Sequence, residues 1–268
     1  MTKPTVIAHR GFSAVAPENT LPAFQRAIDA GADMIEFDVR LTADKQFVVI
    51  HDSTLERTTN GCGLVENHTL SQLQMLDAGA WFGHDFTGAF LPSLGEALKL
   101  CQNRVLVNVE VKTELQDDLA LNGIADLVGK QVDALGATRS VVISSYTRRI
   151  ITRLRDRHEH LTTALLSDEH FTDEAITKLA YASGATALHI PHQLASSSIV
   201  EQTKQAGLLS AVHTVNETSH MQTLIQMGFD ALFTDHPDRM RAQVDRHSES
   251  KETMWSRYLS TSELTPRS

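Results

Sequence analysis

The chain has 268 residues, of which 41% are apolar and 21% charged, and it carries a formal net charge of −9. This composition is typical of a globular protein with a sizeable core. The negative charge argues against a broad surface for nucleic acid or for an anionic membrane, because such surfaces need clustered lysine and arginine. The longest apolar runs, such as Val48–Ile50, are too short to span a membrane.

Two features of the sequence bear on the cellular compartment. The first apolar run begins at Val6, which leaves no room for the charged region and apolar core of a secretory signal. The two cysteines, Cys62 and Cys101, lie far apart, and we interpret them as incidental reduced thiols rather than as a disulfide framework. We therefore expect a cytoplasmic protein that acts on a small molecule, with no nucleic-acid or membrane partner.

Short apolar runs typical of β-strands recur along the chain, separated by helical stretches that end at glycine. The last five runs start at residues 141, 163, 187, 209 and 231, so successive starts are 22 to 24 residues apart. A strand–helix unit repeated in this way predicts a parallel sheet covered by helices. The nine runs are Val6–Ala8, Met34–Val39, Phe47–Ile50, Val105–Val111, Val141–Ser144, Thr163–Leu166, Ala187–Ile190, Leu209–Val212 and Ala231–Phe233.

Nine runs are one too many for an eight-stranded barrel. The link from Arg40 to Gln46 is too short for a parallel crossover, so we expect one of its flanking runs to pair as a hairpin. Residues 52–91 interrupt the rhythm with scattered glycine, threonine and aromatic residues, and we interpret them as a small insertion. We expect one catalytic domain over residues 1–247, including this insertion, followed by a polar tail over 248–268 that either docks as a short helix or stays mobile.

Carboxylates alternate with apolar residues in two of the runs. Glu36 and Asp38 are two residues apart, and side chains at positions i and i+2 of a strand share one face. Two carboxylates that point the same way repel each other unless a cation or protons neutralise them. Glu110 alternates with valines in the same manner, and Lys112 follows on the same face. Because helices cover the outside of such a sheet, we interpret these polar positions as inward-facing active-site residues.

Two histidines complete the set of candidate site residues. His9, followed by Arg10, ends the first apolar run, and His51 ends the third. The two histidines can serve as general acid and general base, and three carboxylates suit Mg²⁺ or Ca²⁺ rather than zinc. Arg10 and Lys112 supply positive charge for an anionic group. Phosphodiester cleavage requires such a set, because charge builds on the non-bridging oxygens while one oxygen attacks and another leaves.

The chain resembles the glycerophosphodiester phosphodiesterase family from end to end, at least through residue 240. Each matching segment is short, but their joint order along the chain is highly specific. The segments are His9-Arg10-Gly11, Pro17-Glu18-Asn19-Thr20, Glu36-Phe37-Asp38-Val39, Thr42-x-Asp44, Val48-Val49-x-His51-Asp52, Arg57-Thr58-Thr59, Leu91-Pro92-x-Leu94-x-Glu96, Glu110-Val111-Lys112, Thr214-Val215-Asn216 and Thr234-Asp235-x-Pro237.

The resemblance implies an α/β fold, a TIM-type (β/α)8 barrel with a small inserted subdomain that matches residues 52–91. Family members convert glycerophosphodiesters to glycerol 3-phosphate and an alcohol such as choline or ethanolamine. The implied site residues are His9 and His51 as the catalytic acid–base pair, Arg10 and Lys112 at the phosphate, and Glu36, Asp38 and Glu110 as ligands of one divalent cation, Mg²⁺ or Ca²⁺.

Three positions depart from the family pattern. His213 stands where family members often carry tryptophan, Tyr146 where phenylalanine often follows the serine pair, and Lys45 where glycine is usual. We expect the first two to line the substrate pocket, so they bear on head-group preference. Asp235, at the end of the last run, either orients a substrate hydroxyl or caps the following helix, and the sequence favours neither.

Two other functions compete with hydrolysis of glycerophosphodiesters. A phospholipase D-like or lysophospholipase D-like enzyme on the same barrel would generally lack the insertion. It would also need apolar residues around its site to bind a lipid substrate. A non-catalytic binding barrel would be expected to lose some of the five histidine and carboxylate positions, all of which are present. An open doubly wound sheet is the rival fold, but it would not gather strand ends so far apart in sequence into one mouth.

Overall fold

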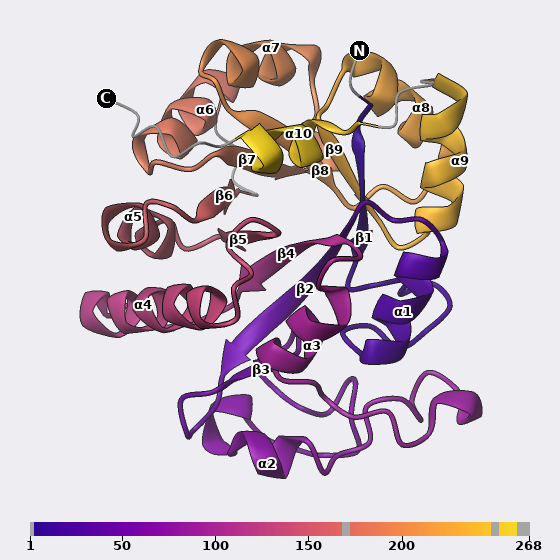
Figure 1. The fold of residues 1–268 in the computed structure, drawn as a ribbon, viewed down its shortest axis with the longest axis vertical. Coiled ribbons are helices and arrows are strands. Elements are labelled where there is room, and N and C mark those ends of the chain that lie inside the picture. The colour runs from indigo at the N-terminus through magenta and orange to yellow at the C-terminus, as the bar shows by residue number, and fades with distance from the viewer. Residues whose placement is uncertain (1–2, 168–171, 248–251, 262–268) are drawn as a thin grey trace.

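The computed structural model describes residues 3–167, 172–247 and 252–261, and its strands form a closed barrel (Figure 1). The barrel closes because β1 pairs in parallel with both β9 and β2. This confirms the parallel sheet predicted from the repeat and the TIM-type barrel implied by the resemblance. The parallel strands that make up this ring in the described residues are β1 (Thr5–His9), β2 (Met34–Leu41), β4 (Leu106–Val111), β5 (Val141–Ser145), β6 (Thr162–Leu166), β7 (Ala187–Pro191), β8 (Leu209–His213) and β9 (Ala231–Thr234).

The third apolar run, Phe47–Ile50, is the one in excess of eight, and it forms the expected hairpin. Strand β3 (Phe47–Val49) pairs antiparallel with the end of β2, Val39 lying opposite Val49. The turn between them contains Lys45 at φ +60°, a left-handed conformation that glycine adopts without cost. The resemblance predicts glycine at this position, and Lys45 adopts the left-handed conformation that a glycine would adopt.

Helices surround the barrel on its outside (Figure 1). Local sequence explains their ends: the side chain of Thr20 accepts from the backbone N–H of Ala23 at the start of α1, and Gly228 ends α8 at φ +87°. The helices of the outer layer are α1 (Leu21–Asp29), α3 (Leu94–Cys101), α4 (Asp118–Ala134), α5 (Arg148–Arg157), α6 (Asp173–Ala182), α7 (Ser197–Gln205), α8 (Thr218–Met227) and α9 (Pro237–His247). Among the residues that the structure describes, no helix is long and apolar enough to cross a membrane.

A short C-terminal helix, α10 (Met254–Thr261), belongs to the barrel core and crosses β7 to β9 in the view of Figure 1. Its residue Trp255 is 0% exposed and, with Leu259, packs in the cluster that lines the barrel interior. The backbone N–H of Lys3, just before β1, donates to Glu252 O at 3.2 Å, which places the helix at the amino-terminal end of the barrel. On β6 to β9 that cluster contains four alanines, which leave room for the indole: Ala164, Ala187, Ala211 and Ala231.

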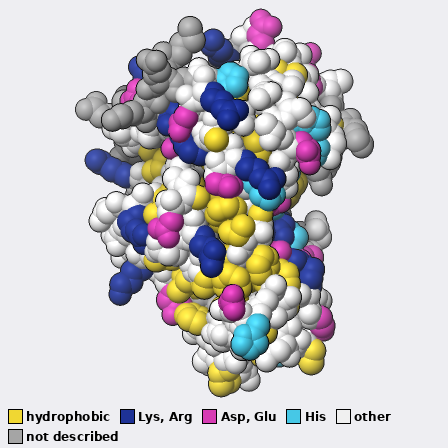
Figure 2. Space-filling model, turned by 90° about the vertical axis from the view of Figure 1, so that its right-hand side faces the viewer, with side chains coloured by type: hydrophobic (Ala, Val, Ile, Leu, Met, Phe, Trp, Pro, Cys, Tyr) yellow, Lys and Arg dark blue, Asp and Glu magenta, His cyan; other side chains and the backbone are white. Residues whose placement is uncertain are grey.

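Residues 52–91 lie between β3 and α3 and form the lower part of the molecule in Figure 1. They contain one short α-helix, α2 (Leu70–Leu73), and two 3-10 helices, Val65–Asn67 and His84–Phe86. They pack around a small apolar cluster that includes Leu55, Val65 and Leu73. Some of their apolar side chains are exposed, Trp81 among them. Figure 2 shows the side of the molecule that lies at the right in Figure 1. On this face, apolar side chains gather in the middle and lower part, and acidic and basic side chains are interspersed above them.

Candidate active site

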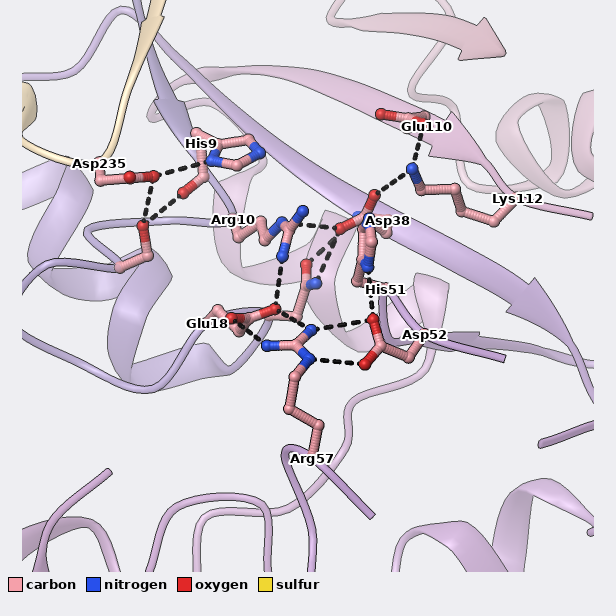
Figure 3. A network of polar contacts seen from close by, with 12 residues as sticks. His9, Arg10, Glu18, Asp38, His51, Asp52, Arg57, Glu110, Lys112 and Asp235 are labelled. Atoms are coloured by element: carbon pink, nitrogen blue, oxygen red, sulfur yellow. Dashed lines mark hydrogen bonds and ion pairs between the residues drawn. The ribbon is translucent and has the colours of Figure 1, made fainter. Parts of the chain in front are cut away.

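The barrel brings the sequence-predicted site residues together at the carboxyl-terminal ends of its strands (Figure 3). The register of β1 and β2 places His9 opposite Glu36, and that of β2 and β4 places Asp38 opposite Glu110. Just after β3, the second strand of the hairpin, the backbone N–H of Ile50 donates to Asp38 O at 3.0 Å. The predicted residues that lie in this one region are His9, Arg10, Asp38, His51, Glu110 and Lys112, labelled in Figure 3, and Glu36, which is grouped with Asp38 and Glu110.

Three carboxylates form the centre of the region. Glu36 and Asp38 are each 1% exposed, Glu110 is 7% exposed, and one oxygen of each lies within 4.8 Å of the others. Glu36 Oε1 is buried without a hydrogen-bond partner. Burial, followed by the neighbouring Asp38 carboxylate, raises the pKa of Glu36 to about 8, and the same two causes raise the pKa of Glu110. Buried carboxylates this close favour a divalent cation, and an all-oxygen set suits Mg²⁺ or Ca²⁺.

Two basic side chains lie against the carboxylates. Lys112 Nζ is 2.6 Å from Glu110 Oε1 and 3.5 Å from Asp38 Oδ1, and Arg10 Nε is 3.3 Å from Asp38 Oδ2. Asn19 Nδ2 donates to the same Asp38 oxygen at 2.9 Å. Burial raises the pKa of Asp38, but Arg10 and Lys112 outweigh it and hold this pKa below its usual value. The cluster therefore keeps at least one carboxylate ionised.

Each predicted histidine is oriented by an aspartate. His9 Nδ1 donates to Asp235 Oδ1 at 2.7 Å, and His51 Nδ1 donates to Asp52 Oδ1 at 2.6 Å. Burial lowers the pKa of His9, but the bond to Asp235 and the Glu36 charge outweigh it, so this pKa is raised. For His51, burial outweighs the Asp38 charge and the bond to Asp52, so the pKa of this ring is lowered. In both rings Nε2 is the nitrogen left for proton transfer.

Asp235 has a role that the sequence left undecided. Its second oxygen accepts from Asn216 Nδ2 at 2.6 Å, and its first oxygen also accepts from Ser13 Oγ at 3.0 Å. A cleft of ≈ 410 Å³ opens at this point, lined by His9, Arg10, Ser13, Ala14, Glu18, Asp235 and His236. Asp235 thus holds His9 at the wall of the cleft.

Arg57 connects the insertion to the site, a contact that sequence reasoning did not identify. Its guanidinium binds Asp52 through Nε at 2.5 Å and Glu18 through Nη1 at 2.8 Å. Glu18 in turn accepts from Arg10 Nη1 at 2.7 Å (Figure 3). The available signal was the position of Arg57 in a matching motif five residues after Asp52.

Two of the three positions that depart from the pattern of the resembled family, Tyr146 and His213, lie near each other. Tyr146 Oη is 3.5 Å from His213 Nε2, and Lys112 Nζ lies 5.5 Å from the centre of the Tyr146 ring. Burial lowers the pKa of His213 to about 3, so the ring is neutral. Both side chains therefore border the basic side of the candidate site.

The other histidines lie apart from the carboxylates. His189 is 0% exposed inside the barrel, 5.1 Å from the Phe233 ring and 6.3 Å from that of Trp255, as a core residue would be. His192 lies beside His220, with ring centres 6.0 Å apart. His236 donates its backbone N–H to Thr234 Oγ1 at 3.1 Å and lines the cleft.

Comparison with known proteins agrees with this geometry. The model of the glycerophosphoryl diester phosphodiesterase family matches residues 9–239. The chain is 36% identical over 239 residues to a glycerophosphodiester phosphodiesterase of Caldanaerobacter subterraneus, covering 89% of this chain and 96% of the relative. It is 32% identical over 246 residues to one of Bacillus altitudinis, covering 89% and 96%.

Solved structures give the same result. A glycerophosphodiester phosphodiesterase of Agrobacterium tumefaciens has a TM-score of 0.76 and 31% identity, over 89% of this chain and 99% of that one. A phosphodiesterase of Oleispira antarctica, solved in complex with the product sn-glycerol-3-phosphate, has a TM-score of 0.81 and 27% identity, over 91% and 97%. The chain therefore belongs to the glycerophosphoryl diester phosphodiesterase family.

Proposed function

We propose that this chain hydrolyses glycerophosphodiesters to glycerol 3-phosphate and an alcohol, with one divalent cation, Mg²⁺ or Ca²⁺, and two histidines. The observation that carries the proposal is the grouping of three buried carboxylates with two aspartate-oriented histidines and two basic side chains. Glycerol 3-phosphate bound to the Oleispira phosphodiesterase supports the substrate class.

Glu36, Asp38 and Glu110 would hold the cation, since their oxygens lie within 4.8 Å of one another and one of them has no hydrogen-bond partner. When bound, such a cation supplies positive charge to the phosphoryl oxygens and orients the diester. Its charge would also keep all three carboxylates ionised, although burial now raises the pKa of two of them. Arg10 and Lys112 would then contact the phosphate.

His9 and His51 would act as the acid–base pair. With each Nδ1 bound to an aspartate, one Nε2 takes a proton from the attacking hydroxyl and the other gives a proton to the departing alcohol. The hydroxyl at position 2 of the substrate's glycerol is an attractive nucleophile, because an intramolecular attack gains effective molarity that a free water lacks. The histidines would exchange roles when water opens the resulting cyclic phosphate.

A product assay tests this function. Glycerophosphocholine and glycerophosphoethanolamine should yield glycerol 3-phosphate and the free alcohol, whereas a lysophospholipase D-like enzyme would prefer lysophosphatidylcholine. His9→Ala or His51→Ala should lower kcat at least about 10²-fold. His192→Ala is the matched control at the same barrel end, and we expect its kcat to stay within a few-fold of wild type. Absence of glycerol 3-phosphate, or equal losses in all three variants, would contradict the proposal.

We also propose a cytoplasmic location. Cys62 is exposed and unpaired and Cys101 is buried and unpaired, which is the usual state of thiols in a reducing compartment. Fractionation of the source cells tests this, with recovery outside the cytoplasm as the contrary result.

A further inference from the structure

A second group of metal-ligating side chains lies far from the candidate active site. Asp133 is in the last turn of α4, His158 is the C-terminal cap of α5, and His160 follows in the connection to β6. These positions precede strands β5 and β6, so they are at the amino-terminal end of the barrel, whereas the carboxylates of the active site are at the other end. Neither the family resemblance nor the proposed hydrolysis uses them.

The three side chains converge on one point. His160 Nε2 is 2.7 Å from Asp133 Oδ1, and His158 Nδ1 is 3.5 Å from Asp133 Oδ2. One ligand atom of each residue lies within 4.8 Å of the other two, and the two imidazole centres are 6.2 Å apart. Zinc binds histidine and carboxylate at about 2.0–2.2 Å with tetrahedral geometry, which places its ligand atoms roughly 3.3 Å apart. Small side-chain rotations therefore suffice to enclose one ion.

His158 is held in the orientation that a metal ligand needs. It is 8% exposed and packs over Gly129 of α4, where an added Cβ would lie 2.8 Å from the imidazole. While Nδ1 faces Asp133, Nε2 faces Asp126 Oδ1 at 3.9 Å. This separation exceeds hydrogen-bond distance, so Asp126 supplies a nearby negative charge on the side of the second ring nitrogen, where ligating histidines usually face a carboxylate.

The supporting carboxylate is itself fixed. Arg153 of α5 binds Asp126 of α4 through Nε at 2.9 Å and Nη2 at 2.7 Å, so it cannot swing toward the ion as a further ligand without losing this pair. Asp133 is also held, because Thr138 Oγ1 donates to Asp133 Oδ1 at 3.4 Å. An ordinary surface ion pair needs one histidine and one carboxylate. Here two histidines share a carboxylate, and one of them is buried with a second carboxylate behind it.

We propose that Asp133, His158 and His160 bind one zinc-like transition-metal ion, with a fourth position left to water. Two imidazoles and one carboxylate favour Zn²⁺ over Mg²⁺ or Ca²⁺, which prefer all-oxygen sets. The ion joins α4 to the connection between α5 and β6, so its role is to stabilise the amino-terminal end of the barrel. It takes no part in hydrolysis.

Zinc binding by the full chain tests the proposal. Chelator-treated protein is titrated with ZnCl₂ and its bound zinc is measured by equilibrium dialysis, in a Glu110→Gln background that impairs the carboxylate site at the other end. His160→Ala should lose one equivalent of zinc, or bind it at least about tenfold more weakly. His84→Ala, an exposed histidine of the insertion, is the matched control and should bind zinc as the parent does.

Two further readouts separate a ligand set from a structural cluster. Zn²⁺ should raise the Tm of the parent and of His84→Ala but not that of His160→Ala. Asp126→Asn should retain the zinc equivalent, with an affinity lowered less than in His160→Ala, because it removes a nearby carboxylate and no ligand. Equal zinc stoichiometry and affinity in the parent and in His160→Ala would overturn the proposal. Loss of Mg²⁺-supported hydrolysis when His160→Ala is made in the wild-type chain, which keeps Glu110, would overturn the separation of the two sites.

Discussion

Asp235 and His9 are 226 positions apart in the chain, yet their side chains share a hydrogen bond of 2.7 Å. Closure of the barrel explains the contact, because β1 pairs with β9, His9 is the last residue of β1, and Asp235 directly follows β9. The bond leaves His9 Nε2 directed away from Asp235, and Asn216 holds the other carboxylate oxygen in place. Asp235 therefore sets both the tautomer and the orientation of a proposed catalytic histidine.

Asp235→Asn removes this charge while keeping the shape of the side chain. We expect kcat to fall on the order of 10²-fold or more, as when the orienting carboxylate of a histidine is neutralised in other hydrolases. Because the hydrogen bond to Asp235 raises the pKa of His9, the limb of the kcat/KM profile that reports His9 should move to lower pH. A profile identical to that of wild type would show that Asp235 does not act through His9.

Arg57→Gln should weaken catalysis without changing the three proposed cation ligands. Arg57 binds both Asp52, the partner of His51, and Glu18, the partner of Arg10. We expect kcat to fall roughly tenfold, the lower range for loss of a supporting contact. Arg149→Gln is the matched control, since the Arg149 side chain is 46% exposed and that of Arg57 44% exposed. Equal kcat values for both variants and wild type would argue against a positioning role for Arg57.

Trp255→Ala should destabilise the barrel while leaving the site chemistry in place. The indole is 0% exposed among inward-facing alanines at the amino-terminal end, so its removal opens a cavity. We expect the free energy of unfolding to fall by about 3–5 kcal/mol, as for other buried aromatic residues. Leu119→Ala, at a position 81% exposed, should change it by less than about 0.5 kcal/mol. Denaturant unfolding measures both, and similar values for the two variants would contradict the core role of α10.

His189 should make the fold sensitive to acid. Burial lowers its pKa from 6.5 to about 3, and neither ring nitrogen has a hydrogen-bond partner among the described residues. Below pH 6.5 the unfolded chain binds a proton here and the folded chain does not, so stability falls as pH decreases toward 3. Relative to His189→Leu, wild type should lose up to about 1.4 kcal/mol per pH unit in that window. Parallel stability curves for the two proteins would exclude this contribution.

Much of the fold and of the site follows from the sequence because both depend on short-range pattern. Apolar runs at a spacing of 22 to 24 residues predict strand–helix units, and alternation within a run places Glu36 and Asp38 on one face. The short link after Arg40 predicts the hairpin of β2 and β3, which the pairing confirms. Parallel strands end at one edge, so strand-end residues must meet once the barrel closes.

The remaining features depend on contacts between distant segments. The alanines inside the barrel appear as ordinary apolar residues until Trp255 fills the space beside them. The link through Arg57 requires the path of the insertion, which has no clear periodicity. The convergence of Asp133 with His158 and His160 requires α4 and α5 to lie side by side, and no local pattern predicts that adjacency.

Removal and return of the divalent cation tests the central claim most directly. Wild-type protein is stripped with chelator, and glycerol 3-phosphate release from glycerophosphocholine is measured before and after addition of Mg²⁺ or Ca²⁺. We expect no release without cation, full release after its return, and a cation requirement shifted to higher concentration in Glu110→Gln, which keeps the other two ligands. Release at the full rate from a rigorously metal-free preparation would contradict the account.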